Sequence, residues 1–166
     1  MFLRAAIGPD ATEAVVAIRR PVEDVFRFYR DFRNLPRFLG DVMAIDQTGP
    51  AAYRWTVQGP LGLRLKWTAT VTGERANEFI SYETAPLPGL KTSWAIYLSA
   101  ASETGTTEVR EVMKTPLGKV GRVGLALMGK PPAGEVSANL RRLKEVMETG
   151  TVKDASYSVA GKFTRS

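Results

Sequence analysis

Six consecutive runs in which apolar and polar residues alternate constrain the fold of this chain more than any other feature. Residues that favour turns, mainly glycine and proline, separate the runs. Successive side chains of a β-strand point to opposite faces of a sheet, so this alternation predicts antiparallel strands with one apolar and one polar face. The runs cover residues 42–49, 52–59, 63–74, 79–85, 91–101 and 106–115. In the third run, Leu63, Leu65, Trp67, Ala69 and Val71 are predicted to share the apolar face.

One strand and two helical segments are predicted before these runs. Residues 12–20 alternate and contain valines, which indicates a first strand. Pro21 stands where helices often begin, and apolar residues then recur every three or four positions, so we predict an amphipathic helix that ends near Asp31. The segment 32–42, FRNLPRFLGDV, predicts a second, very short helix closed by Gly40.

A single long helix is predicted near the C-terminus, where Val136, Leu140, Leu143 and Met147 form an apolar stripe and polar residues such as Arg142 lie off it. An apolar sheet face must be covered, and this helix is available to cover it. The order of elements therefore predicts an α+β fold: a seven-stranded antiparallel curved sheet wrapped around a long C-terminal helix, with two short helices after the first strand. The short helix of FRNLPRFLGDV would then be the lid of a cavity.

The length of 166 residues and the 44% content of hydrophobic residues suit a single domain with a substantial core. We expect this domain to span residues 1–150 and to be followed by a polar C-terminal extension, residues 151–166, of unknown order. No window is apolar enough for a membrane span, and the N-terminus lacks the apolar run of a signal peptide. We therefore expect a cytoplasmic protein.

Histidine and cysteine are both absent from the sequence. Their absence excludes disulfides, cysteine nucleophiles, Ser-His-Asp triads and the usual zinc sites. Catalysis would have to come from carboxylates, tyrosine, lysine, arginine or a bound cofactor. We expect neither a cofactor nor a metal site.

The net charge is +6, of which residues 91–166 carry +5. Lys119 and Arg122 make segment 117–130 basic and amphipathic, which fits either transient contact with an anionic membrane or an ordinary solvated helix surface. Nucleic-acid binding is not expected, because charge is its only support and the aromatic residues are predicted to lie inside. An exposed edge strand or the basic segment could also serve a homodimer.

Glu111 is the most informative polar residue, because it occupies an apolar phase of its strand between Val109 and Met113. If a cavity exists, Glu111 would point into it, and burial would raise its pKa. It would then be a polar anchor for a ligand or, as a weak candidate, a catalytic acid or base. Alternatively, a bulge changes the phase of the strand, or a salt bridge holds the carboxylate at the rim. The predicted ligand-binding residues are Phe38, Tyr53, Trp55, Trp67, Tyr82, Trp94, Glu111 and Met113, although the aromatic ones could equally be plain core.

The order of elements and several local motifs resemble the START-like or SRPBCC superfamily, which has a helix-grip fold. Within that superfamily the sequence is most similar to bacterial polyketide cyclase/dehydrase and lipid-transport proteins over residues 12–150, and coenzyme Q-binding relatives share the architecture. No catalytic motif of these families transfers residue by residue. The resemblance rests on Pro21, Val25, Phe26, Asn34, Pro36, Phe38 and Val42, and on the segments GPLGLRLKWTATVTGE, LGKVGRVGLALMGKPP and LRRLKEVMETG.

This resemblance implies a cavity that binds or transports a hydrophobic small molecule such as a lipid, an isoprenoid or quinone, or a polyketide-like compound. One alternative is an enzyme of the polyketide cyclase or dehydratase type, in which Glu111 or a tyrosine moves a proton. A second alternative is a module that binds a protein partner through the basic second half of the chain.

Overall fold

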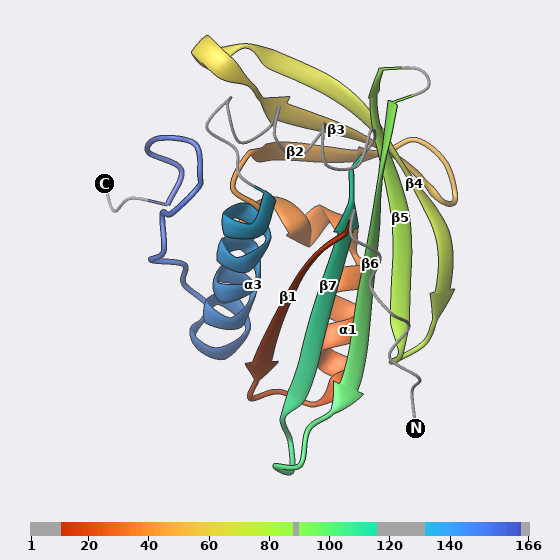
Figure 1. The fold of residues 1–166 in the computed structure, drawn as a ribbon, viewed down its shortest axis with the longest axis vertical. Coiled ribbons are helices and arrows are strands. Elements are labelled where there is room, and N and C mark those ends of the chain that lie inside the picture. Colours follow the sequence, from red (N-terminus) through yellow and green to blue (C-terminus); the bar gives the residue numbers. More distant parts are fainter. Residues whose placement is uncertain (1–10, 88–89, 116–131, 164–166) are drawn as a thin grey trace.

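The computed structural model describes residues 11–87, 90–115 and 132–163 (Figure 1). Its elements follow the predicted order and form a single antiparallel sheet with strand order β1-β7-β6-β5-β4-β3-β2. The strands are β1 (Ala11–Ile18), β2 (Val42–Gln47), β3 (Ala52–Gln58), β4 (Arg64–Arg75), β5 (Phe79–Leu87), β6 (Leu90–Ala100) and β7 (Thr107–Lys114). The helices are α1 (Val22–Arg30), α3 (Pro132–Thr149) and two short 3-10 helices, η1 (Phe32–Arg37) and η2 (Pro60–Gly62).

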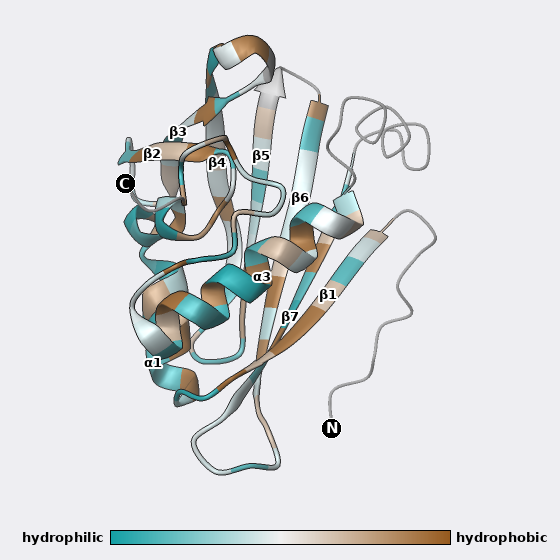
Figure 2. Cartoon of the chain, turned by 90° about the vertical axis from the view of Figure 1, so that its left-hand side faces the viewer, coloured by the Kyte–Doolittle hydropathy of each residue, from teal (hydrophilic) through white to brown (hydrophobic). Residues whose placement is uncertain are grey.

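Strands β2 to β7 form a meander, and β1 returns to pair with β7 at the far edge. The sheet curves around α1 and α3, and α3 crosses its inner face (Figures 1 and 2). The helix α3 packs mainly on β1 and β7. These observations confirm the predicted seven-stranded curved sheet with one long C-terminal helix.

The core lies between the inner face of the sheet and the two helices. Val25 and Tyr29 of α1 are buried, and so are Val136, Leu140 and Leu143 of α3. The apolar stripe predicted for the last helix is therefore confirmed.

The prediction for the start of the third run was wrong, since Leu63 and Leu65 are 59% and 39% exposed. The apolar inner face of β4 begins only at Trp67, which is partly buried, and at Ala69, which is fully buried. The tip of the β3–β4 hairpin, where η2 lies, extends past the helices (Figure 2), so no helix of the described residues covers the first residues of β4.

The lid segment, residues 32–42, contains the predicted second short helix as the 3-10 helix η1. The Asp31 side chain caps its start by accepting a hydrogen bond from the backbone N–H of Arg33 at 3.2 Å. Four apolar side chains of this segment, Phe32, Leu35, Phe38 and Leu39, are at most 5% exposed. The lid therefore buries its apolar residues against the inner face of the sheet and the helices.

Arg142 is completely buried, although the helical pattern placed it off the apolar stripe of α3. Its guanidinium donates to the backbone oxygen of Phe38 at 2.6 Å, to Asn139 Oδ1 at 2.6 Å and to the backbone oxygen of Ser156 at 2.5 Å. The arginine thus joins the lid, α3 and the C-terminal extension. It is buried because the extension covers a helix side that the pattern of α3 alone leaves polar.

The described part of the extension, residues 151–163, lies against the domain rather than apart from it. The backbone N–H of Val159 donates to Gly40 O at 2.9 Å, and Lys162 Nζ donates to the backbone oxygens of Leu39 and Val42. A Cβ at Gly40 would lie 2.5 Å from the backbone oxygen of Tyr157, so the close approach of extension and lid requires glycine there.

Candidate ligand cavity

A cavity of about 90 Å³ lies where the end of the lid meets α3 and the inner face of the sheet. The sheet contributes aromatic and threonine side chains, whereas the lid end and α3 contribute apolar and polar ones. The lining residues are Leu39, Asp41, Val42, Trp55, Trp67, Tyr82, Thr84, Thr92, Trp94, Glu135 and Asn139.

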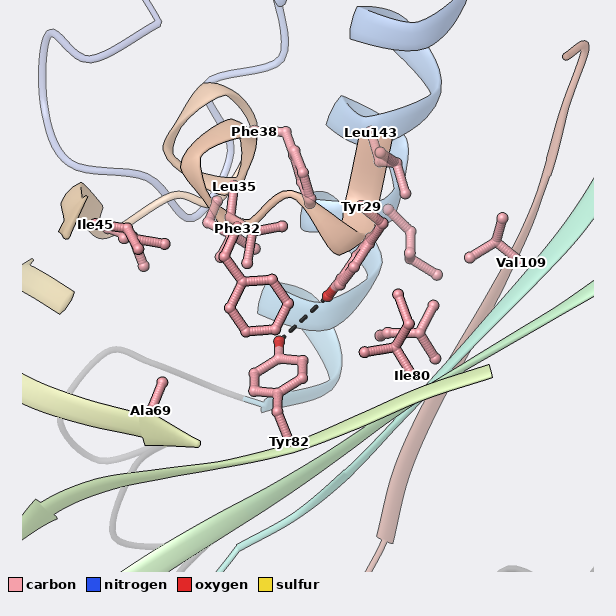
Figure 3. Close-up of a cluster of buried hydrophobic side chains, with 14 of the residues drawn as sticks. Tyr29, Phe32, Leu35, Phe38, Ile45, Ala69, Ile80, Tyr82, Val109 and Leu143 are labelled. Carbon is pink, nitrogen blue, oxygen red and sulfur yellow. Dashed lines mark hydrogen bonds between the residues drawn. The ribbon is translucent and has the colours of Figure 1, made fainter. Parts of the chain in front are cut away.

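Tyr82 on β5 is the central ring of the cavity wall. It stacks on Trp94 with the ring centroids 6.0 Å apart and the planes 7° from parallel, and it lies 5.8 Å from the Trp55 ring. Phe32 of the lid meets Tyr82 edge-on at 5.1 Å (Figure 3). Because rings packed on several sides cannot rotate freely, this wall is preformed.

Two hydrogen bonds occupy polar groups of this wall. The hydroxyls of Tyr29 and Tyr82 lie 3.2 Å apart (Figure 3), and Trp94 Nε1 donates to Thr84 Oγ1 at 3.2 Å. By contrast, the indole N–H of Trp55 is buried and has no acceptor among the described residues. Trp55, a lining residue, therefore has a buried indole donor that the described residues leave unpaired.

Glu111 on β7 lies fully inside the protein, and neither carboxyl oxygen has a hydrogen-bond partner in the part of the chain that the structure describes. Burial, and then the negative charge of Glu135, raises the pKa of Glu111 to about 8. The carboxyl group is therefore largely protonated at neutral pH. Burial, followed by the proximity of Tyr82 and of Glu111, raises the pKa of Tyr29 well above its usual value. Burial, followed by the proximity of Glu111, does the same for the pKa of Tyr82.

Both alternative interpretations of Glu111 are wrong. Strand β7 pairs with β1 and β6 without a register shift, so no bulge changes its phase. A salt bridge at the rim is excluded because Glu111 is 0% exposed and its oxygens have no partner among residues 11–87, 90–115 and 132–163.

Half of the predicted ligand-binding residues line the cavity, namely Trp55, Trp67, Tyr82 and Trp94. The other half, Phe38, Tyr53, Glu111 and Met113, are buried but lie outside its lining.

The structure explains two of these placements. The Phe38 ring packs on Tyr29 at 5.7 Å, and Tyr53 turns its hydroxyl toward Arg30, whose Nη1 donates to it at 3.0 Å. Tyr53 thereby borders an open groove of about 580 Å³ beside α1.

Sequence reasoning missed the polar lining residues. Thr84 and Thr92 share the strand phase of Tyr82 and Trp94, so the same alternation could have indicated them. Asn139 and Glu135 carry no such signal, because they stand beside the apolar stripe of α3. The segment 117–130, for which membrane contact was one interpretation, lies outside the described residues.

Among residues 11–87, 90–115 and 132–163, no helix is long and apolar enough to cross a membrane. Within the same residues no group of three or more acidic side chains could hold a metal ion.

Comparison with known proteins gives a family and a fold. A family model described as polyketide cyclase / dehydrase and lipid transport matches residues 10–148. No protein among the curated ones matches the chain. The C-terminal extension, from residue 151, lies beyond the family match.

Solved structures match over most of the chain at low identity. A START superfamily protein from Mycobacterium smegmatis is 16% identical with a TM-score of 0.66, and the match covers 85% of this chain and 99% of that one. A protein from Deinococcus radiodurans is 22% identical with a TM-score of 0.64, covering 84% and 98%. DynU16, from the dynemicin biosynthetic locus, is 19% identical with a TM-score of 0.62, covering 89% and 50%. The chain therefore belongs to the polyketide cyclase/dehydrase and lipid transport family and has the START-like helix-grip fold.

Proposed function

We propose that the protein binds a hydrophobic small molecule, of the lipid, isoprenoid, quinone or polyketide-like kind, in the cavity between the sheet and α3. The observation that carries this proposal is the cavity wall itself, in which three tryptophans and Tyr82 converge beneath the lid. Apolar and aromatic walls with a few placed polar groups are the usual composition of ligand sites. The family match adds support from lipid transport and polyketide chemistry in relatives.

The size of the cavity limits how much of a ligand it encloses. Pockets for drug-sized ligands measure roughly 300–1,000 Å³, whereas this cavity measures about 90 Å³. We therefore expect it to enclose one ring or a short chain segment, with the rest of a larger ligand extending toward the mouth.

Native mass spectrometry of the gently purified protein, followed by organic extraction, tests the proposal. We expect a reproducible hydrophobic ligand that disappears in Thr92→Trp, which places a large ring in the cavity. Thr70→Trp on the exposed outer face of β4 is the matched control and should keep the ligand. A protein that is empty, and that also ignores a panel of lipids, quinones and aromatic polyketides, would contradict the proposal.

A second candidate function is an enzyme of the cyclase or dehydratase type, favoured by the buried Glu111. Its pKa of about 8 suits proton transfer near neutral pH. Glu111 does not line the cavity and has no hydrogen bond to Tyr82, so the substrate or a water molecule would have to reach its carboxyl group directly. Turnover of a polyketide-like substrate with a pH profile that changes in Glu111→Gln would support this function, and ligand retention without turnover would contradict it.

A further inference from the structure

We propose that the C-terminal extension is a latch on the cavity. While it is docked, it holds the lid end, residues 38–42, against α3, and its release lets a ligand enter and leave. This inference rests on the proposed function, because it describes access to the same cavity. The extension lies beyond the family match, which ends at residue 148.

Most of the lid end belongs to neither a helix nor a strand, because it lies between η1 and β2. The extension supplies hydrogen bonds that a regular element would otherwise provide. Lys162 Nζ donates to the backbone oxygens of Leu39 and Val42. The backbone N–H of Val159 donates to Gly40 O at 2.9 Å. The position of the lid end therefore depends on the extension.

Arg142 extends this dependence to the first residue of the lid end. Its guanidinium donates to Phe38 O at 2.6 Å and to Ser156 O at 2.5 Å. It also donates at 2.6 Å to Asn139 Oδ1, which accepts from the Gly40 N–H at 3.1 Å. This one side chain of α3 thus binds the lid end and the extension together, so detachment of the extension weakens its hold on the lid end.

The residues held in this way are also residues of the cavity. Leu39 and Val42 of the lid end line it, and so does Asn139 of α3. The sheet side of the cavity consists of rings packed on one another, such as Tyr82 stacked on Trp94, and it cannot move without disrupting the core. The lid end is therefore the part of the boundary that can open, and the extension controls it.

The extension can detach without unfolding the domain, because it contributes little to the core. More than half of residues 151–163 are exposed, and none of them is fully buried. In this described part of the extension, only Val152 packs against the main hydrophobic core. Segments with few buried apolar contacts open at a lower free energy than the core does. Release of the extension as a unit is therefore the least costly way to free the lid end.

Amide hydrogen exchange on the full-length protein tests whether the extension holds the lid end. Lys162→Met removes both hydrogen bonds from the ammonium group to the lid end. We expect the amides of Gly40 and Val159 to exchange about 10-fold faster in this variant, because they open together. The amide of Leu140, in the buried part of α3, should exchange at an unchanged rate and so verifies folding.

Stopped-flow fluorescence with N-phenyl-1-naphthylamine, a neutral aromatic probe, tests whether the same opening admits a ligand. A latch limits passage in both directions. We therefore expect Lys162→Met to accelerate association and dissociation of the probe by about 10-fold each and to leave its Kd within about 2-fold. Loss of a direct ligand contact would instead accelerate dissociation alone.

Lys153→Met is the matched control. Lys153 is an exposed lysine of the same extension whose side chain makes no hydrogen bond or ion pair with the described residues, so its loss should change neither measurement. Val159→Pro is an independent second variant, because it removes the N–H that donates to Gly40 O. It should accelerate Gly40 exchange and probe binding as Lys162→Met does.

Gly40 exchange that is unchanged in both Lys162→Met and Val159→Pro would overturn the inference. So would faster exchange with unchanged rates of probe association, since the extension would then hold the lid end without controlling access. Failure of the probe to bind any of these proteins would count against the proposed function, and the control of ligand access would fall with it.

Discussion

Arg142 on α3 and Glu111 on β7 are both 0% exposed, yet their surroundings are opposite. Arg142 donates hydrogen bonds to the lid, to its own helix and to the C-terminal extension. Glu111 has no hydrogen-bond partner among the described residues, and burial raises its pKa to about 8. Arg142 keeps its charge because oxygen acceptors surround it, and Glu111 is largely neutral because the described part of the fold offers its carboxyl group no hydrogen-bond partner.

This difference indicates that Arg142 has a structural role, whereas Glu111 is a candidate for a functional one. A buried polar group with a complete set of partners holds elements in one arrangement. A buried group without partners destabilises the native state, and such groups are concentrated at functional sites. By this criterion the extension and the lid end form a rigid part of the structure, and we propose that the region around Trp55, Tyr82 and Glu111 is the part concerned with function.

Arg142→Met should cause the largest loss of stability, because it removes the side chain that connects the lid, α3 and the C-terminal extension. Loss of the guanidinium removes the donor to Phe38 O and Ser156 O and one of the two donors to Asn139 Oδ1, which still accepts from Gly40 N–H. We expect the free energy of unfolding to fall by about 5 kcal/mol, as for loss of several hydrogen bonds to a buried charge. Urea denaturation measures it. The control is Arg141→Met, which removes a half-exposed ion pair to Asp154 and should cost less than about 1 kcal/mol. Equal losses in the two variants would refute the distinction.

The pH dependence of stability in Glu111→Gln tests whether the Glu111 carboxyl group is buried in its neutral form. The folded state raises the pKa of Glu111 from 4.5 to about 8, so it holds a proton that the unfolded chain releases. Stability from this group is therefore complete below about pH 4.5 and is lost as pH rises toward 8 and beyond. The shift corresponds to at most roughly 5 kcal/mol, and we expect about half of it because relaxation lets water reach the charge.

The measurement is the free energy of unfolding between pH 5 and 9. Glu111→Gln should lose less stability than the unmodified protein as pH rises, so its relative stability should increase. Glu108→Gln, on the exposed face of the same strand, should leave the pH dependence as it is. Parallel pH curves for the unmodified protein and Glu111→Gln would show that the carboxyl is not buried in neutral form.

Local periodicity explains which of these features were predictable from the sequence. The period of two placed Glu111, Trp55 and Tyr82 on the inner face correctly, because strand alternation depends only on neighbouring residues. That no described residue hydrogen-bonds to Glu111 was not predictable, since it depends on how α1, the lid and α3 pack over the sheet.

Arg142 and the extension show the limit of the same reasoning. The helical period placed Arg142 off the apolar stripe and gave no sign of its burial, because two of its acceptors, Phe38 O and Ser156 O, come from outside α3. Residues 151–163 have no period, since side chains and single backbone groups hold them rather than a regular ladder. Irregular segments of this kind leave no repeating pattern for sequence reasoning to detect.

The smallest change in stability is expected at the contact between the C-terminal extension and α3. A Cβ at Gly134 of α3 would lie 2.5 Å from the Tyr157 ring, so Gly134→Ala should displace that ring. With Tyr157 already truncated to alanine, the same change should instead stabilise α3 by up to about 1 kcal/mol, the helix preference of alanine over glycine. A double-mutant cycle by urea denaturation should therefore give a coupling of about 1 kcal/mol. Additive effects would mean that the extension does not seat Tyr157 on α3 in solution, and the joint around Arg142 would then hold the lid and the helix without it.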